Sequence, residues 1–354
     1  MAGMGTAVAA GGLAQLTQAA EGAYHGPPEL TVARAFTEWT LDPWMLVLVL
    51  ILGGGYLAAL RRQPDWPVAR RIWFLGLGLG FLVIATMSFV GVYQPVLFWV
   101  RALQTVLLVL VVPLFLALGR PISLAVAVLP RAGARLEAVI RSRPARVLTF
   151  PAITAFALVG VPFAMYFTSW YTAVFHSTTV RELTFLALMI PGFAFFWTLL
   201  RVDPVPKEYS YGVSMWITGA EVIGDAFLGI AVIASQNLIG ADWYHALARP
   251  WGPSLQTDQV LGGGVLWVLG DLVGLPFLAA QLIQLMREDE SDAARIDAEL
   301  DAREARQARE AREARQAREA REARQAPAGG VPDENGTKPW WEDDPRFTNR
   351  FKPT

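Results

Sequence analysis

The stretch "VLFWVRALQTVLLVLVVPLFLALG" at residues 96–119 determines what kind of structure this chain can form. A membrane-spanning helix needs about 20 mostly apolar residues to cross about 30 Å of hydrocarbon, and this run has that length. Arg101 and Gln104 lie in its first third, one helical turn apart. A charged side chain at such a depth is costly, and by default it indicates a functional site. The stretch therefore predicts a helix in lipid with a polar functional face.

The composition places the whole chain in the same class. Of its 354 residues 54% are hydrophobic, and the mean hydropathy is +0.36. The formal net charge of −1 does not reveal that charged residues are unevenly distributed along the chain, since most of them follow residue 286. There is no Cys, which excludes disulfides, thiolate metal sites and Cys nucleophiles. A membrane protein without a nucleic-acid partner is expected.

Six further apolar runs accompany the first. The seven predicted spans cover residues 43–60, 72–93, 96–118, 147–168, 179–200, 212–235 and 260–286. Helices are the only plausible form, because an open strand would leave backbone groups unpaired in lipid. The predicted fold is all-α, a polytopic membrane bundle of seven transmembrane helices over residues 43–286.

The basic residues predict the orientation. The connections 61–71 and 119–146 carry four and six Arg, and they fall on the same side of the membrane. Because cytoplasmic loops are rich in Lys and Arg, we expect the N-terminal segment 1–42 outside and the C-terminus in the cytoplasm. The predicted location is the bacterial plasma membrane, with the lipid bilayer as the immediate environment.

The region after the last span has different chemistry. Residues 287–326 contain a repeat of R-[E/Q]-A triplets made of strong helix formers, which predicts a charged cytoplasmic helix. This helix is either a solvated rod or lies along anionic lipid. Residues 327–354 are expected to form a disordered tail, in which Trp340 and Trp341 offer a docking peptide for a protein partner.

Several polar residues inside the spans form a candidate intramembrane site. Its predicted members are Arg101, Gln104, Thr105, Glu221, Asp225 and Asp271. Glu221 and Asp225 share one helix face, because they are four residues apart. We predict an ion pair between Arg101 and Asp225; the alternative is that Arg101 snorkels to the outer surface. Arg181 and Glu182 lie at the outer mouth of the fifth span.

No catalytic motif appears, so an enzyme is the least favoured class. The Gly clusters "LGGGY" (52–56) and "LGGGVLW" (261–267) indicate close helix packing rather than phosphate loops. Each of the three histidines, His25, His176 and His245, is expected to be a solvated residue on the outer side, and a shared metal site is the minority alternative.

Several stretches together resemble one family. They are "ATMSFVGVYQPVLF" (85–98), "SRPARVLTFP" (142–151), "FFWTLLRVDP" (195–204), "DAFLGIA" (225–231), "ADWYHALARPWGPSLQTDQVLGGGVLWVLGD" (241–271) and "LMREDE" (285–290). They are similar to the polytopic CtaG family of cytochrome c oxidase assembly proteins. The resemblance implies a plasma-membrane protein that helps to mature a haem–copper oxidase through copper delivery, with oxidase subunits as partners.

The resemblance also implies histidines that this chain lacks. An H-x-x-x-H pair is implied where Arg101 and Thr105 stand, and a third His where Asp225 stands. Gln104 matches the family's polar position between the two histidines. A guanidinium cannot ligate a metal at neutral pH, whereas imidazole is a good copper ligand. Copper as a cofactor therefore rests on the resemblance alone. The weak metal candidates left are His176, His245, Met87 and Met165, with Met189 and Met215 as further soft donors.

Two functions follow as hypotheses. The first is a membrane-embedded assembly factor or chaperone for cytochrome c oxidase that holds no metal of its own. The alternative is an ion or proton transporter, in which the charged residues line a path through the bilayer. Those residues are Arg101, Glu221, Asp225 and Asp271.

Overall fold

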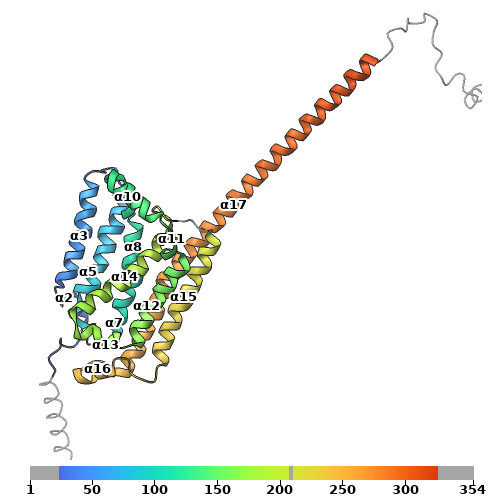
Figure 1. The fold of residues 1–354 in the computed structure, drawn as a ribbon. Helices are drawn as coiled ribbons and strands as arrows, with labels where there is room; N and C mark the ends of the chain where they lie inside the picture. The colour runs from blue at the N-terminus through green and yellow to red at the C-terminus, as the bar shows by residue number, and fades with distance from the viewer. Residues whose placement is uncertain (1–23, 207–209, 326–354) are drawn as a thin grey trace, which may run out of the picture. The chain divides into compact units, whose positions relative to one another are not determined.

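The computed structural model describes residues 24–206 and 210–325. Every regular element in those residues is a helix, which confirms the all-α class (Figure 1). The contacts divide the chain into two units, Met1–Met286 and Arg287–Thr354. The predictions for residues 327–354, including Trp340 and Trp341, lie outside the described residues.

The helices differ widely in length. In chain order they are α2 (Val32–Thr37), α3 (Pro43–Leu60), α4 (Val68–Arg71), η1 (Ile72–Gly78), α5 (Leu79–Met87), α6 (Phe89–Tyr93), α7 (Phe98–Val106), η2 (Leu107–Val111), α8 (Val112–Leu118), α9 (Pro121–Val128), α10 (Pro130–Ile140), α11 (Arg143–Leu148), α12 (Pro151–Phe167), α13 (Trp170–His176), α14 (Thr178–Leu200), α15 (Tyr211–Ala234), α16 (Ala241–Leu247) and α17 (Leu255–Gln325). Beyond Met286, the described part of the second unit is the exposed remainder of α17.

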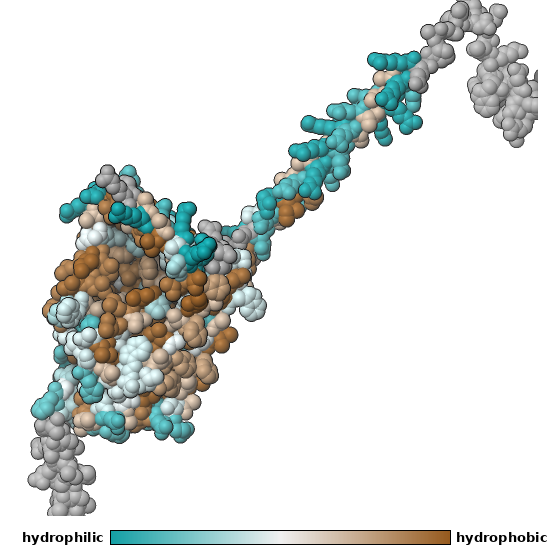
Figure 2. Space-filling model, in the orientation of Figure 1, coloured by the Kyte–Doolittle hydropathy of each residue, from teal (hydrophilic) through white to brown (hydrophobic). Residues whose placement is uncertain are grey.

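Six of the described helical stretches are long and apolar enough to cross a membrane by themselves. The predicted span 147–168 corresponds to α12, which has 17 residues and reaches the required length only together with α13, across a 73° bend. The described residues thus provide six spans, or seven if the bent pair counts as one. On the face shown in Figure 2, brown apolar side chains are spread over the body of the first unit among paler ones, and teal hydrophilic side chains lie toward its two ends, as expected for a multi-pass membrane protein.

The stretch that carries Arg101 lies at the centre of the first unit. Of the apolar window of Phe98–Val128, 72% is buried inside the protein, against 17% for α3. The π-helix η2 interrupts this stretch just before Pro113. Proline lacks the N–H that a regular helix would use, so a change of hydrogen-bond register beside it is expected. The central helix is therefore locally irregular one turn beyond the polar residues.

Small residues set the closest helix contacts. Gly192 of α14 lies so near the carbonyl oxygen of Val109 in η2 that a Cβ would collide with it. Gly229 and Gly263 face each other where α15 crosses α17. Such contacts are typical in lipid, where close van der Waals packing replaces the hydrophobic driving force. The predicted packing role agrees with this at Gly262 and Gly263 of the cluster 261–267 and at Gly53 of the cluster 52–56. It is wrong at Gly54, Gly55 and Gly264, where no described atom lies near the position of a Cβ.

Short helices close the two ends of the first unit (Figure 1). The end that holds α13 and α16 is called the α16 end, and the end that holds α10 and α11 is called the α10 end. At the α10 end, Asp203 accepts hydrogen bonds from the backbone N–H groups of Ile122 and Ser123 and so caps α9. Burial raises the pKa of Asp203, and the hydrogen bonds from Ser123 and Ile122 oppose that rise.

Candidate functional site

The position of α7 is fixed by a carboxylate from a distant part of the chain. No side chain close in sequence caps the first turn of α7. Asp258 of α17 supplies the acceptors instead, with Oδ2 3.1 Å from the Phe98 nitrogen and Oδ1 3.0 Å from the Trp99 nitrogen. A carboxylate at a helix N-terminus satisfies free N–H groups and complements the helix dipole. Asp258 therefore sets the place of the helix that carries Arg101.

Asp258 is itself neutralised by a buried partner. Its Oδ2 lies 3.2 Å from Nη2 of Arg249, and the two side chains are 1% and 2% exposed. The Arg249 guanidinium also lies 5.0 Å from the centre of the Trp251 ring, a cation–π distance. All three residues belong to the 241–271 stretch on which the family resemblance rests. Residues of that stretch thus hold the first turn of α7 in place.

Arg101 is completely enclosed, with 1% of its side chain exposed. Nη1 donates to Oε1 of Gln104 at 2.7 Å and to Oε1 of Gln94 at 3.2 Å, and Nη2 contacts the sulfur of Met165 at 3.4 Å. Gln104 in turn donates from Nε2 to the carbonyl oxygen of Ala85 at 2.8 Å. We call Arg101, Gln94, Gln104, Thr105 and Met165 the Arg101 cluster. Neutral amide oxygens and a thioether solvate its charge.

Aromatic rings enclose the cluster toward the α16 end. Thr105 and the hydroxyl of Tyr166 lie 3.1 Å apart, and the hydroxyls of Tyr171 and Tyr244 lie 2.7 Å apart. The guanidinium carbon of Arg101 lies 5.9 Å from the centre of the Phe175 ring. Aromatic faces attract a cation and exclude water, so they suit a buried guanidinium.

The ion pair predicted between Arg101 and Asp225 is wrong: within the described residues no carboxylate lies in ion-pair range of Arg101. The snorkelling alternative is wrong as well, because the side chain is enclosed. Gln104 lies three residues after Arg101 on the same helix face and engages the guanidinium locally. Asp225 instead lines a small cavity beside Thr105, one turn farther along α7.

The three intramembrane acids form a group of their own, here called the acidic cluster: Glu221, Asp225 and Asp271. The side chains of Glu221 and Asp225 lie within hydrogen-bond reach of each other on α15, and both are within electrostatic range of Asp271 on α17. Gly270 of α17 leaves room for the Asp225 carboxylate. Oδ1 of Asp271 is buried and has no hydrogen-bond partner in the described part of the chain. The structure thus places the predicted site residues in two clusters rather than one.

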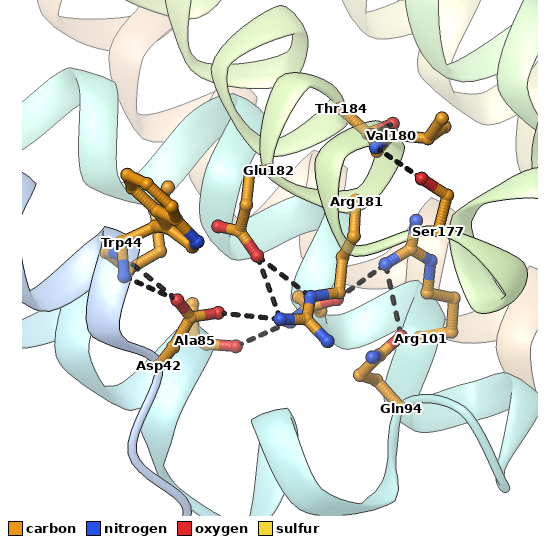
Figure 3. Close-up of polar contacts among 12 residues, drawn as sticks. Asp42, Trp44, Ala85, Gln94, Arg101, Ser177, Val180, Arg181, Glu182 and Thr184 are labelled. Carbon is orange, nitrogen blue, oxygen red and sulfur yellow. Dashed lines mark hydrogen bonds and ion pairs between the residues drawn. The ribbon is translucent and has the colours of Figure 1, made fainter.

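A charged triad adjoins the Arg101 cluster. Nη2 of Arg181 lies 3.3 Å from Oδ2 of Asp42 and 2.9 Å from Oε1 of Glu182 (Figure 3). Asp42 also caps α3 by accepting from the Trp44 and Met45 nitrogens. A small polar cavity of about 80 Å³ is lined by this triad's Asp42 and Arg181 together with Gln94 and Gln104. Arg181 and Glu182, expected at the mouth of a span, therefore lie beside the buried guanidinium.

The residues present do not suit the copper ion that the family resemblance implies. The described residues hold no group of three or more His, Cys, Asp and Glu side chains placed to bind a metal. His176 and His245 are exposed, and His176 packs edge-on against Trp243. Met87 is buried at the end of α5, and the sulfur of Met165 is engaged by Arg101. A guanidinium, two amides and one thioether are a poor donor set for copper.

Sequence reasoning missed three parts of the site. Gln94 stands out in the sequence, since it is the one amide in an apolar stretch just before Pro95, and it could have been found. The tyrosines look like an interfacial belt, which hides their role around Arg101. Asp258 resembles an ordinary first-turn acid of α17, and its contact 160 residues away carries no local signal.

Comparison with known proteins gives the following matches. The family model described as "Cytochrome c oxidase caa3 assembly factor" matches residues 54–288. Uncharacterized proteins of Mycobacterium bovis and Mycobacterium tuberculosis are each 32% identical over 292 residues, and one of Mycobacterium leprae is 28% identical over 291 residues. Each alignment covers 79% of this chain and 44% of the relative, so the chain spans less than half the length of these relatives. No solved structure matches.

Proposed function

Because the chain belongs to the cytochrome c oxidase caa3 assembly factor family, we propose that it acts in the plasma membrane as an assembly factor for a cytochrome c oxidase. The membership agrees with the resemblance found in the sequence, and it suggests a role other than catalysis. In this proposal the chain is a scaffold that holds no metal ion of its own. The α16 end faces outward, because the Arg-rich connections lie at the α10 end.

The observation that carries this proposal is the enclosed guanidinium of Arg101. It stands where the family resemblance implies a metal-binding histidine, and it is held by Gln94, Gln104 and Met165. A permanent cation with fixed hydrogen bonds links α7 to α12 and to the chain before α7 without a metal. A small polar cavity lined by Asp42 and Arg181 adjoins this cluster. We propose that an oxidase subunit is recognised at the α16 end.

Deletion of the gene tests the assembly role directly. We expect the haem absorbance of assembled cytochrome c oxidase in membranes to fall, and the wild-type chain supplied in trans to restore it. The absorbance of another haem-containing membrane complex serves as the control and should not change. Unchanged oxidase spectra in the deletion strain would contradict the proposal.

Metal analysis tests the metal-free part separately. The purified full chain, incubated with Cu(I) and freed of excess ion, should retain far less than one copper ion per chain, because the site offers no suitable donor set. Tightly held stoichiometric copper would contradict the metal-free scaffold but not the assembly role.

The acidic cluster favours transport as a second candidate function. Asp271 has a buried carboxylate oxygen without a described partner, close to two more acids, and intramembrane acids often form ion or proton paths. In proteoliposomes, a transporter would carry protons or cations across the membrane, and Asp271→Asn would abolish the flux. Flux equal to that of empty liposomes would remove this candidate.

A further inference from the structure

Two apolar clefts lie side by side toward the α10 end of the first unit. The first, of about 500 Å³, runs between α3 and α9, and the second, of about 380 Å³, runs between α3, α8 and α14. Both are within the size range of about 300–1,000 Å³ that is usual for ligand pockets. Leu52, Phe74 and Pro121 line both clefts and form the ridge that separates them. The two clefts together therefore form an apolar groove that divides in two around this ridge.

The ridge is held rigidly by buried polar contacts. The ring of Tyr56 stacks on Phe74 with 4.1 Å between the centres. The Tyr56 hydroxyl donates to the carbonyl oxygen of Gly119 at 2.8 Å and accepts from the indole of Trp66 at 3.1 Å. These bonds tie α3 to the end of α8, so the clefts are built into the fold. They do not depend on a mobile loop.

Two polar groups at the clefts have no partner among the described residues. Arg62 lines the first cleft at the C-terminal end of α3 and forms no ion pair there. Trp197 lines the second cleft and is 9% exposed, and its indole N–H is buried without an acceptor. Because the indole nitrogen is covered by protein atoms, the polar group that a ligand in the clefts can meet is the guanidinium of Arg62. A ligand that is apolar at one end and anionic at the other suits both the apolar walls and that cation.

We propose that the two clefts bind one phospholipid with an anionic headgroup. One acyl chain lies in each cleft on either side of the Phe74 ridge, and the headgroup phosphate pairs with Arg62. The charge of Arg62 and the basic connection 61–71 around it favour an anionic over a zwitterionic lipid. This site is independent of the assembly role and would remain if that role were disproved.

The chain offers a matched pair of variants for the test. Gly55 lines the first cleft and Gly54 does not, and neither has a heavy atom near the position of a Cβ. Gly55→Leu therefore fills the cleft without disturbing the protein, while Gly54→Leu adds the same side chain outside it. Ala125→Leu, from α9, fills the same cleft from the other wall if Gly55→Leu does not fold.

The full chain is incorporated into vesicles of phosphatidylcholine and phosphatidylglycerol, extracted in mild detergent and weighed by native mass spectrometry. We expect one retained phosphatidylglycerol per chain for the wild type and Gly54→Leu, and loss of most of it for Gly55→Leu or Ala125→Leu. Arg62→Gln should reduce the preference for phosphatidylglycerol over phosphatidylcholine about fivefold, the effect of one Arg at an anionic surface.

Three outcomes would overturn the proposal. In the first, the wild type retains no lipid. In the second, Gly55→Leu and Ala125→Leu retain as much lipid as the wild type and show the same preference for phosphatidylglycerol. Alternatively, the spectra could show a dimer that Gly55→Leu converts to monomer, in which case a second copy of the chain occupies the clefts.

Discussion

The Arg101 cluster and the acidic cluster are two solutions to the same problem, the presence of charge inside a membrane bundle. Around Arg101 the charge is enclosed by neutral acceptors that engage Nη1 and Nη2, while its Nε is buried without a partner in the described part of the chain. In the acidic cluster three carboxyl groups gather between α15 and α17, and Oδ1 of Asp271 is buried without a hydrogen-bond partner in the described residues. The first cluster is held by hydrogen bonds between unlike groups, whereas the second brings like groups together.

The difference teaches how the two clusters should respond to mutation. Removing a polar partner from a closed network leaves another group unpaired and destabilises the protein. Removing one of several like charges relieves repulsion and stabilises it. A loss of stability on mutation therefore indicates a structural cluster, whereas a gain in stability indicates residues that are kept for function.

Asp258→Ala should have the greatest effect, because it strands Arg249 and uncaps α7. Removing one partner of a buried ion pair typically costs about 3–5 kcal/mol. We expect the free energy of unfolding in detergent to fall by about that amount. The exposed Asp292, paired with Arg295 on α17, provides the control. Asp292→Ala should change the free energy of unfolding by less than about 0.5 kcal/mol. Equal effects of the two variants would show that Asp258 does not hold α7.

Gln104→Leu should destabilise the protein less. The change removes the 2.7 Å acceptor of the guanidinium and the donor to the Ala85 carbonyl. A hydrogen bond to a charged group contributes about 1.5–3 kcal/mol, so a loss of about 2–3 kcal/mol is expected in the same unfolding measurement. Gln284→Leu alters an exposed amide of α17 and should be nearly neutral. A neutral Gln104→Leu would mean that Arg101 has another acceptor.

Asp271→Asn should act in the opposite direction. It replaces the carboxyl group of Asp271, one oxygen of which is buried without a partner among the described residues, by a neutral amide. We expect a stabilisation of about 1 kcal/mol, because the amide cannot repel the two neighbouring acids. Asp301→Asn, on the exposed part of α17, is the matched control. A destabilised Asp271→Asn would indicate that the acid normally holds a bound cation or proton donor.

The sequence predicted the helices well, because an apolar run of about 20 residues has few alternatives in lipid. It also singled out Arg101 and Gln104, which are polar in an apolar stretch and do lie together. It did not predict the bend between α12 and α13, because the apolar run continues toward the bend at Thr168 and Ser169.

The partners of the charged residues were harder to predict. The apolar runs place both Arg101 and Asp225 inside the membrane, but they do not specify the face that a helix turns toward its neighbour. That face is set by contacts such as Asp258 with α7 and the glycine crossing of α15 and α17, which join residues far apart in the chain. The predicted pair failed for this reason, although both residues are intramembrane and functional candidates.

A double-mutant cycle of Arg101→Ala and Asp225→Ala tests most directly whether the two clusters are separate. Because the guanidinium bonds to Gln94, Gln104 and Met165, the two changes in the free energy of unfolding should add to within about 0.5 kcal/mol. A coupling energy above about 1 kcal/mol would show that Arg101 and Asp225 interact after all, and the division into two independent clusters would then be wrong.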